Sequence, residues 1–166
     1  HKVMNPDIKI LNIFKTDIDK LYGNTDLSPN MEDYIETIAI LSEANRVVRV
    51  RDIATELKIK MPSVTAALNK LKEQGLIEYE KYGYIELTSR GGVIARRVIS
   101  RHMCLKEFFE TILKLPSAKA EEEACRIEHH ISPDTCKQLH KLLIYYKSNE
   151  GEARDWIKNL EDVMKP

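Results

Sequence analysis

The sequence predicts a mainly α-helical protein, with a winged helix-turn-helix in its first half and helices alone in its second half. Three short helical patterns, at about 29–44, 50–57 and 62–74, precede two short segments in which apolar and polar residues alternate around a turn. Beyond Arg90, apolar residues recur at helical spacing. Three helices and a two-stranded ribbon form a winged helix-turn-helix, in which the third helix enters the major groove of DNA.

Length and composition limit the class of protein. A chain of 166 residues holds one ordinary domain or two small ones, and 43% hydrophobic with 31% charged residues is typical of a soluble globular protein. No apolar run approaches the roughly 20 residues needed to span a bilayer, so we expect no membrane partner. The three cysteines show no CxxC spacing, which predicts a reducing compartment and a cytoplasmic location.

The first predicted element is an amphipathic helix over residues 6–22. Pro6 lies near its start and Gly23 just past its end, as helix termini prefer. We therefore expect residues 1–27 to form an N-terminal helical extension, joined to the next helix by a short polar linker.

The helix expected over 29–44 carries two acidic residues on one face. Asp33 and Glu36 lie three positions apart, so one metal ion could collect both carboxylates. The alternative is that Asn30 caps the helix and that acidic residues are favoured in its first turn. That alternative explains Asp33 better than Glu36, which lies a full turn further along.

The helix expected over 62–74 has a small or polar outer face suited to DNA. Pro62 occupies its first position and Gly75 follows its end. Small and polar side chains approach base edges and phosphates closely. The predicted DNA-contacting residues are Lys60, Pro62, Ser63, Thr65, Ala66, Asn69 and Lys70. The alternative is a winged helix that serves only for protein contacts.

Residues 76–80 and 84–88 are expected to form the β-hairpin wing. Further helices are predicted from about Gly92 to Leu115, over 117–130, from Pro133 onwards, and after Gly151. So many amphipathic helices need an apolar partner, which predicts a homodimer.

The strongest chemical signal lies in the predicted helix at 117–130. Cys125, Glu128 and His129 share one helical face and present a sulfur, a carboxylate and an imidazole, a donor set that suits a divalent transition metal. The alternative is a surface helix in which Cys125 is a small core residue. His102 is a further candidate, provided that the fold brings it to these donors.

Five motifs together resemble the diphtheria-toxin-repressor family of metal-dependent transcriptional repressors, within its manganese-transport-regulator branch. These motifs, over residues 30–148, are Met31-Glu32-Asp33-Tyr34-Ile35-Glu36, Pro62-Ser63-Val64-Thr65, Leu87-Thr88-Ser89-Arg90-Gly91, Arg101-His102 and Ile127-Glu128-His129-His130. The resemblance implies metal ligands at Asp33, Glu36, His102, Cys125, Glu128 and His129. It also implies a homodimer that binds a palindromic operator in double-stranded DNA and represses metal-uptake genes, with Mn(II) or Fe(II) as corepressor.

Departures from the family pattern concern the metal. Asp33 and Glu36 match the manganese branch, whereas Cys125 matches the iron branch. Thiolate is a softer ligand than carboxylate, so Zn(II) and Co(II) remain alternatives. Lys106 stands where the iron branch places an acidic ligand, so that branch's ancillary site is not expected.

The resemblance divides the chain at stated boundaries. We expect the extension at 1–27, the DNA-binding domain at 28–90, a helical metal-binding and dimerisation domain at 91–148, and a C-terminal helix at 149–166, without an SH3-like domain. A metalloenzyme and a metal-free scaffold are the competing functions. No general base or phosphate-cradling glycine loop accompanies the donors, so we expect neither catalysis nor a small-molecule substrate.

Overall fold

The computed structural model describes residues 17–45, 47–80, 83–148, 155 and 159. Within this part of the chain there are two compact units, one formed by residues 24–99 and the other by 17–23 together with 100–148. The predicted helix over 6–22 is described only from residue 17, and the predicted C-terminal helix lies almost wholly outside the described residues.

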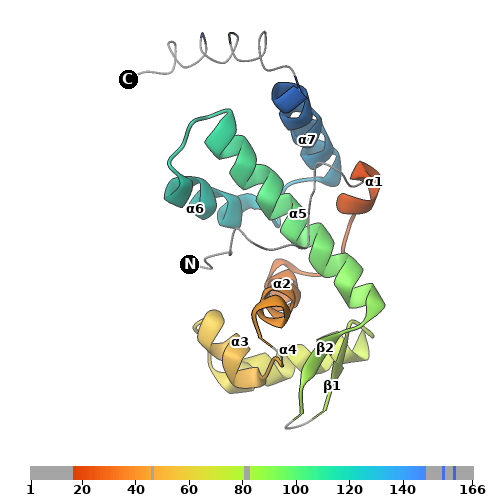
Figure 1. Cartoon of the computed structure of the whole chain (residues 1–166). Helices are drawn as coiled ribbons and strands as arrows, with labels where there is room; N and C mark the ends of the chain where they lie inside the picture. The colour runs from red at the N-terminus through yellow and green to blue at the C-terminus, as the bar shows by residue number, and fades with distance from the viewer. Residues whose placement is uncertain (1–16, 46, 81–82, 149–154, 156–158, 160–166) are drawn as a thin grey trace. The chain divides into compact units, whose positions relative to one another are not determined.

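The first unit is a winged helix-turn-helix, as predicted (Figure 1). Its elements in chain order are α2 (Pro29–Ala44), α3 (Val50–Glu56), α4 (Met61–Glu73), β1 (Ile77–Tyr79) and β2 (Ile85–Leu87). The two strands pair antiparallel, and Val48 adds an isolated bridge to Ile85. Helix α2 packs against α3, α4 and β2, and its buried Tyr34, Ile35 and Ile38 belong to the core of this unit.

Two backbone features fix the course of the chain around α4. Lys58, in the turn between α3 and α4, has a φ of 55°, a left-handed conformation that is uncommon for a residue with a side chain. At the other end, Gly75 has a φ of 69°, and the Leu76 amide donates to the Leu71 carbonyl at 2.9 Å. This glycine-terminated helix end redirects the chain into β1.

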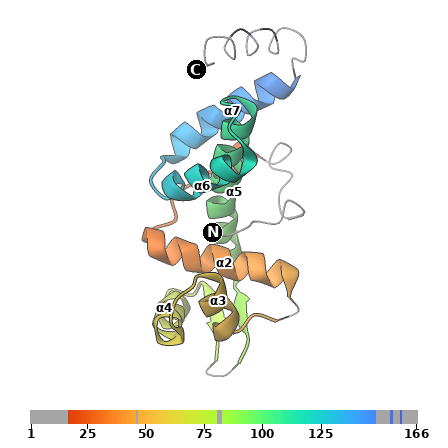
Figure 2. The same cartoon turned by 90° about the vertical axis from the view of Figure 1, so that its left-hand side faces the viewer.

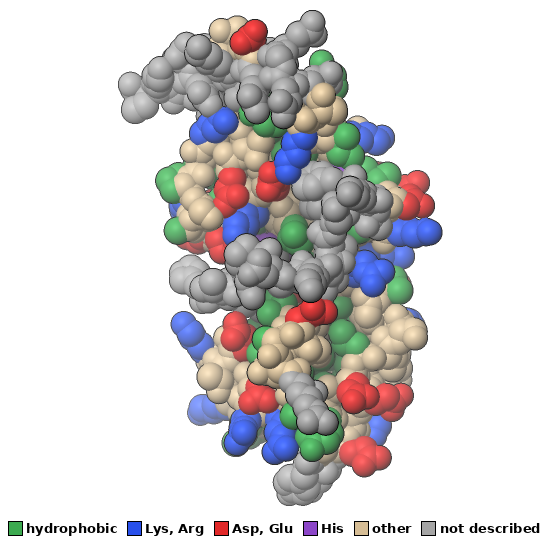
Figure 3. All heavy atoms as spheres, in the orientation of Figure 1, with side chains coloured by type: hydrophobic (Ala, Val, Ile, Leu, Met, Phe, Trp, Pro, Cys, Tyr) green, Lys and Arg blue, Asp and Glu red, His purple; other side chains and the backbone are tan. Residues whose placement is uncertain are grey.

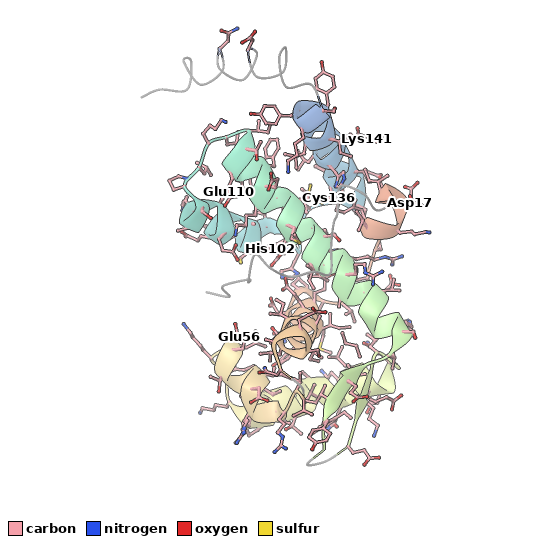
Figure 4. The ribbon with its side chains drawn as sticks, in the orientation of Figure 1. Asp17, Glu56, His102, Glu110, Cys136 and Lys141 are labelled. Carbon is pink, nitrogen blue, oxygen red and sulfur yellow. The ribbon has the colours of Figure 1, made fainter. Side chains whose placement is uncertain are left out.

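The second unit is helical. It holds α1 (Ile18–Leu21), α6 (Ser117–Ile127), α7 (Pro133–Ser148) and the second part of α5, which runs from Ser89 to Thr111. Side chains of α5 contact α7 at two places. The Cys104 thiol of α5 lies 3.8 Å from the Cys136 carbonyl of α7 (Figure 4 labels Cys136). The Lys147 ammonium of α7 lies 2.8 Å from Glu107 of α5.

A segment from before the DNA-binding unit completes the second unit. Leu21 and Tyr22 are buried there, and the Tyr22 hydroxyl lies 2.8 Å from Nδ1 of His140 on α7. Asp19 forms an ion pair with Lys137, also on α7, at 2.7 Å. Figure 2 shows the second unit from another direction.

Both ends of α5 differ from the predictions. Helix α5 begins at Ser89 rather than near Gly92, because the Thr88 side chain accepts a hydrogen bond from the Gly91 amide at 3.0 Å and caps the helix. The same helix ends at Thr111 rather than near Leu115, and Lys114 beyond it has a φ of 55°. No helix in the described part of the chain is long and apolar enough to cross a bilayer.

Candidate metal centre

Three of the predicted metal ligands meet in the second unit. His102 comes from α5, Cys125 from α6, and Glu128 from the turn that follows α6. Their nearest ligand atoms all lie within 4.8 Å of one another. Figure 4 labels His102 on α5, on the side where α6 lies.

The contacts identify which imidazole nitrogen faces the other donors. Nδ1 of His102 lies 2.8 Å from Oε2 of Glu128 and 3.9 Å from the Cys125 sulfur. Donor atoms bound to one tetrahedral ion lie about 3 to 4 Å apart, given the usual metal–ligand bond lengths. The separation of Nδ1 from the sulfur falls in this range, whereas Nδ1 and the carboxylate oxygen lie at hydrogen-bond distance from each other.

Helix α6 ends earlier than the predicted helix over 117–130. It ends at Ile127, and the His130 amide donates to the Ile127 carbonyl at 2.9 Å in the following turn. Glu128 nevertheless keeps helical backbone angles, with φ of −55° and ψ of −32°. Cys125 and Glu128 therefore keep the relative placement expected for residues three positions apart on a helix, although Glu128 lies just beyond the last residue of α6.

His129 stands beside the three-donor cluster rather than in it. Its Nε2 lies 3.4 Å from Oε1 of Glu128, and its side chain is only 8% exposed. Its imidazole contacts Oε1 of Glu128, whereas Nδ1 of His102 contacts Oε2 of the same carboxylate.

Glu121 and Lys106 were not among the predicted site residues; Glu121 contacts the cluster, and Lys106 contacts Glu121. Oε1 of Glu121 lies 3.2 Å from Nε2 of His102, and Oε2 lies 2.9 Å from the Lys106 ammonium. Helical spacing offers a signal for both, because Glu121 precedes Cys125 by four positions and Lys106 follows His102 by four. The sequence does not show that these two faces meet.

The charges around His102 oppose the effect of its burial. Burial lowers its pKa, but contacts with Cys125, Glu121 and Glu128 raise the pKa of His102 to about 12. Burial likewise raises the pKa of Glu121, and the stronger effect of His102 and Lys106 brings it down to about 2. Without metal, His102 is thus an imidazolium held between two carboxylates.

The donor set fits a divalent transition metal. A buried imidazole and a buried carboxylate, from His102 and Glu128 (each 2% exposed), converge with the half-buried thiol of Cys125. Such a mixture of nitrogen, sulfur and oxygen ligands is one that zinc, cobalt and iron accept.

Asp33 and Glu36 lie on α2, in the first unit. The Glu36 side chain is buried, with 1% exposed, whereas Asp33 is half-buried. A buried glutamate is unusual for a solvated helix face. The alternative of ordinary acidic residues in a first helical turn is therefore weaker for Glu36.

The predicted DNA-contacting residues lie on or just before α4. Thr65 is half-buried and the remaining six are exposed. The full predicted set is Lys60, Pro62, Ser63, Thr65, Ala66, Asn69 and Lys70. The buried stripe of α4, formed by Val64, Ala67, Leu68 and Leu71, faces the core. Figure 3 shows Lys and Arg side chains gathered on the surface of this unit, where α3 and α4 lie.

Comparisons with known proteins cover both units. Residues 26–85 match the iron dependent repressor N-terminal DNA binding domain, and residues 88–156 match the iron dependent repressor metal binding and dimerisation domain. The HTH-type transcriptional regulator MntR of Bacillus subtilis is 35% identical over 134 residues, which is 81% of this chain and 93% of the relative. Its counterpart in Oceanobacillus iheyensis is 35% identical over 135 residues, or 81% and 91% of the two chains.

Solved structures show the same fold. The manganese regulator SloR is 28% identical with a TM-score of 0.62, over 72% of this chain and 55% of SloR. ScaR with bound Zn²⁺ is 27% identical with a TM-score of 0.62, over 70% of this chain and 55% of ScaR. This chain therefore spans about half the length of these two solved regulators.

Proposed function

Because this chain belongs to the iron dependent repressor family, we propose that it is a transcriptional repressor whose binding to DNA depends on a divalent metal ion. The observation that supports this most directly is the convergence of His102, Cys125 and Glu128 within 4.8 Å. These residues lie in the region that matches the metal binding and dimerisation domain.

The proposed ligand set extends beyond the three-donor cluster. His129 is included because it is buried next to Glu128, and Asp33 and Glu36 are included on the family resemblance. Asp33 and Glu36 belong to the DNA-binding unit. Shared coordination with the second unit would couple metal binding to DNA binding, which is allostery between two sites.

The chemistry of the donors bears on which metal is used. Asp33, Glu36 and Glu128 supply oxygen ligands that suit Mn(II), whereas the Cys125 thiolate suits the softer Fe(II), Co(II) or Zn(II). We propose Mn(II) or Fe(II) as the corepressor, with a zinc- or cobalt-responsive regulator as the alternative. The manganese regulator SloR and ScaR with bound Zn²⁺ are both structural neighbours.

The proposed partner is double-stranded DNA with a palindromic operator, bound by a homodimer in the cytoplasm. The exposed polar face of α4, with Asn69 and Lys70, is suited to the major groove. We further propose the domain division stated above: an extension at 1–27, DNA binding at 28–90, metal binding and dimerisation at 91–148, and a C-terminal helix at 149–166.

A Glu128→Gln variant tests the function and the site together. This change keeps the side-chain volume but removes the carboxylate charge, so metal-dependent DNA binding should fall by at least about tenfold. DNA binding is measured on an operator selected from random sequence, titrated anaerobically with Mn(II), Fe(II), Co(II) and Zn(II). Glu122→Gln is the matched control, because Glu122 is a partly exposed residue of α6 paired with Lys119.

Two results would contradict the proposal at different levels. Metal-dependent DNA binding that survives in Glu128→Gln defeats the assignment of the site. Strong DNA binding by the wild-type protein that a chelator leaves unchanged defeats the metal-dependent function itself.

A further inference from the structure

The imidazole of His102 has a charged partner on each nitrogen. Nδ1 faces Glu128 and Cys125, whereas Nε2 faces Oε1 of Glu121 at 3.2 Å. The second oxygen of Glu121 lies 2.9 Å from the Lys106 ammonium. Lys106, Glu121 and His102 thus form a chain of charges that ends at the nitrogen facing away from the other donors.

Burial of these side chains decreases from His102 to Lys106. Side-chain exposure is 2% for His102, 15% for Glu121 and 25% for Lys106. In the described part of the chain, Nε2 of His102 and both Glu121 oxygens are shielded from solvent, and their polar contacts are the ion pairs with each other and with Lys106. Their ion-pair contacts are therefore the interactions that offset the cost of burying them.

A metal-bound histidine needs such a partner on its second nitrogen. An imidazole binds a metal through one lone pair while the other nitrogen carries a proton, and a carboxylate that accepts this proton fixes the tautomer and the ring orientation. Glu121 lies on Nε2, the side opposite to Cys125 and Glu128.

We propose that Glu121 is a positioning residue that holds the Nε2 proton of His102 and so directs the Nδ1 lone pair toward the metal, and that Lys106 acts through Glu121 as its charge partner. This inference rests on the proposed function, because it assumes a metal ion on the Nδ1 side of the ring.

The position of Lys106 has a further effect on the site. Its ammonium supplies the positive charge beside Glu121, so the carboxylate is neutralised without a second metal ion. The spacing that places both residues is helical, since Lys106 follows His102 by one turn of α5 and Glu121 precedes Cys125 by one turn of α6.

The first test uses the wild-type protein loaded with Zn(II), which is diamagnetic. Nuclear magnetic resonance of the ring nitrogens of His102 should show a protonated Nε2 and a metal-shifted Nδ1. A ring with metal on Nε2 and the proton on Nδ1 would overturn the proposal. This measurement needs no variant and is independent of whether any substitution folds.

The second test measures Co(II) affinity and the sulfur-to-cobalt absorption of Glu121→Gln. Because outer partners of metal-bound histidines contribute tenfold or more to affinity, we expect a loss of at least about tenfold, with the Nε2 signal of His102 shifted. Glu123→Gln is the matched control: it removes the same charge from α6, where Glu123 pairs with Lys119 and Arg126. Unchanged affinity and an unchanged His102 signal in Glu121→Gln would overturn the proposal.

A double-mutant cycle separates Lys106 from Glu121. If Lys106 acts through Glu121, then Lys106→Met weakens Co(II) binding in the wild type but has little further effect in Glu121→Gln. Additive losses would overturn the role given to Lys106. A wild-type protein that binds no Co(II) would contradict the proposed function, whereas normal wild-type binding with an unaffected Glu121→Gln contradicts this inference alone.

Discussion

The proton on His102 links the candidate site to the stability of the metal-free protein. Burial lowers the pKa of His102, but Cys125, Glu121 and Glu128 raise it from 6.5 to about 12. The folded state therefore keeps a proton that the unfolded state releases above about pH 6.5. The resulting stabilisation is complete below that pH and is lost as the pH rises toward the folded pKa.

The metal-free protein should accordingly lose stability between about pH 7 and about pH 8.5. The group contributes a decline of up to about 1.4 kcal/mol in the free energy of unfolding per pH unit. Denaturant unfolding at several pH values, in the presence of a chelator, measures this slope. His102→Gln is the comparison, and its slope over the same range should be clearly smaller; equal slopes would show that His102 is not the group responsible.

At the scale of single residues, the sequence predicted which metal donors of one helix lie together, but not which donors of different helices meet. Cys125 and Glu128 lie three positions apart, and helical spacing alone placed them together. The approach of His102 to these two residues depends on how α5 packs against α6, which no local pattern specifies. Glu121 was missed for the same reason, since its importance comes from the ring nitrogen that it faces.

At the scale of elements, the start of α5 is fixed by a close approach of backbone to backbone. A β-carbon on Gly91 would lie 1.9 Å from the carbonyl oxygen of Leu76, just before β1. The neighbouring Gly92 has no atom within 4 Å of the same position. Of these two adjacent glycines, Gly91 thus has no room for a side chain, whereas Gly92 has room for one.

Gly91→Ala and Gly92→Ala form a matched pair. Gly91→Ala should destabilise the protein by about 3 kcal/mol, because rigid backbone rather than a flexible side chain must move. Gly92→Ala should stabilise it by about 0.5 to 1 kcal/mol, because alanine restricts the unfolded chain and favours the helix. Thermal and denaturant unfolding measure both changes, and similar stabilities for the two variants would contradict the close approach.

The predicted elements were correct in type and order across the described winged helix and the helices α5 to α7. Their ends were less predictable because side-chain capping and turns decide them. Thr88 starts α5 before the two glycines, which by themselves suggested a later start. The end of α6 at Ile127 depends on the turn that follows it, rather than on the helical pattern that continues through His129.

At the scale of the whole molecule, α5 is shared by the two units. It runs from Ser89 to Thr111 without interruption, and the boundary between the units falls after Ile99. The first part of this helix therefore belongs to the winged-helix unit, and its second part carries His102.

Insertion of one alanine between Ile99 and Ser100 tests this connection. It turns the second part of α5 by about 100° and moves it by about 1.5 Å relative to the first. His102, Cys125 and Glu128 belong to one unit, so Co(II) binding to them should persist, whereas binding to a palindromic operator should fall at least about tenfold because half-site spacing is a geometric requirement. Operator binding at the wild-type level would show that the helix does not transmit orientation.

The packing of Leu21 and Tyr22 against the second unit also has a consequence for biosynthesis. Residues 17–23 leave the ribosome early, but Lys137 and His140, which they contact, are among the last described residues to be made. The DNA-binding unit at 24–99 is complete in the nascent chain before α6 and α7 exist. Since domains fold as units and the N-terminal one folds first during synthesis, the DNA-binding unit is expected to fold before the residues of the second unit have met.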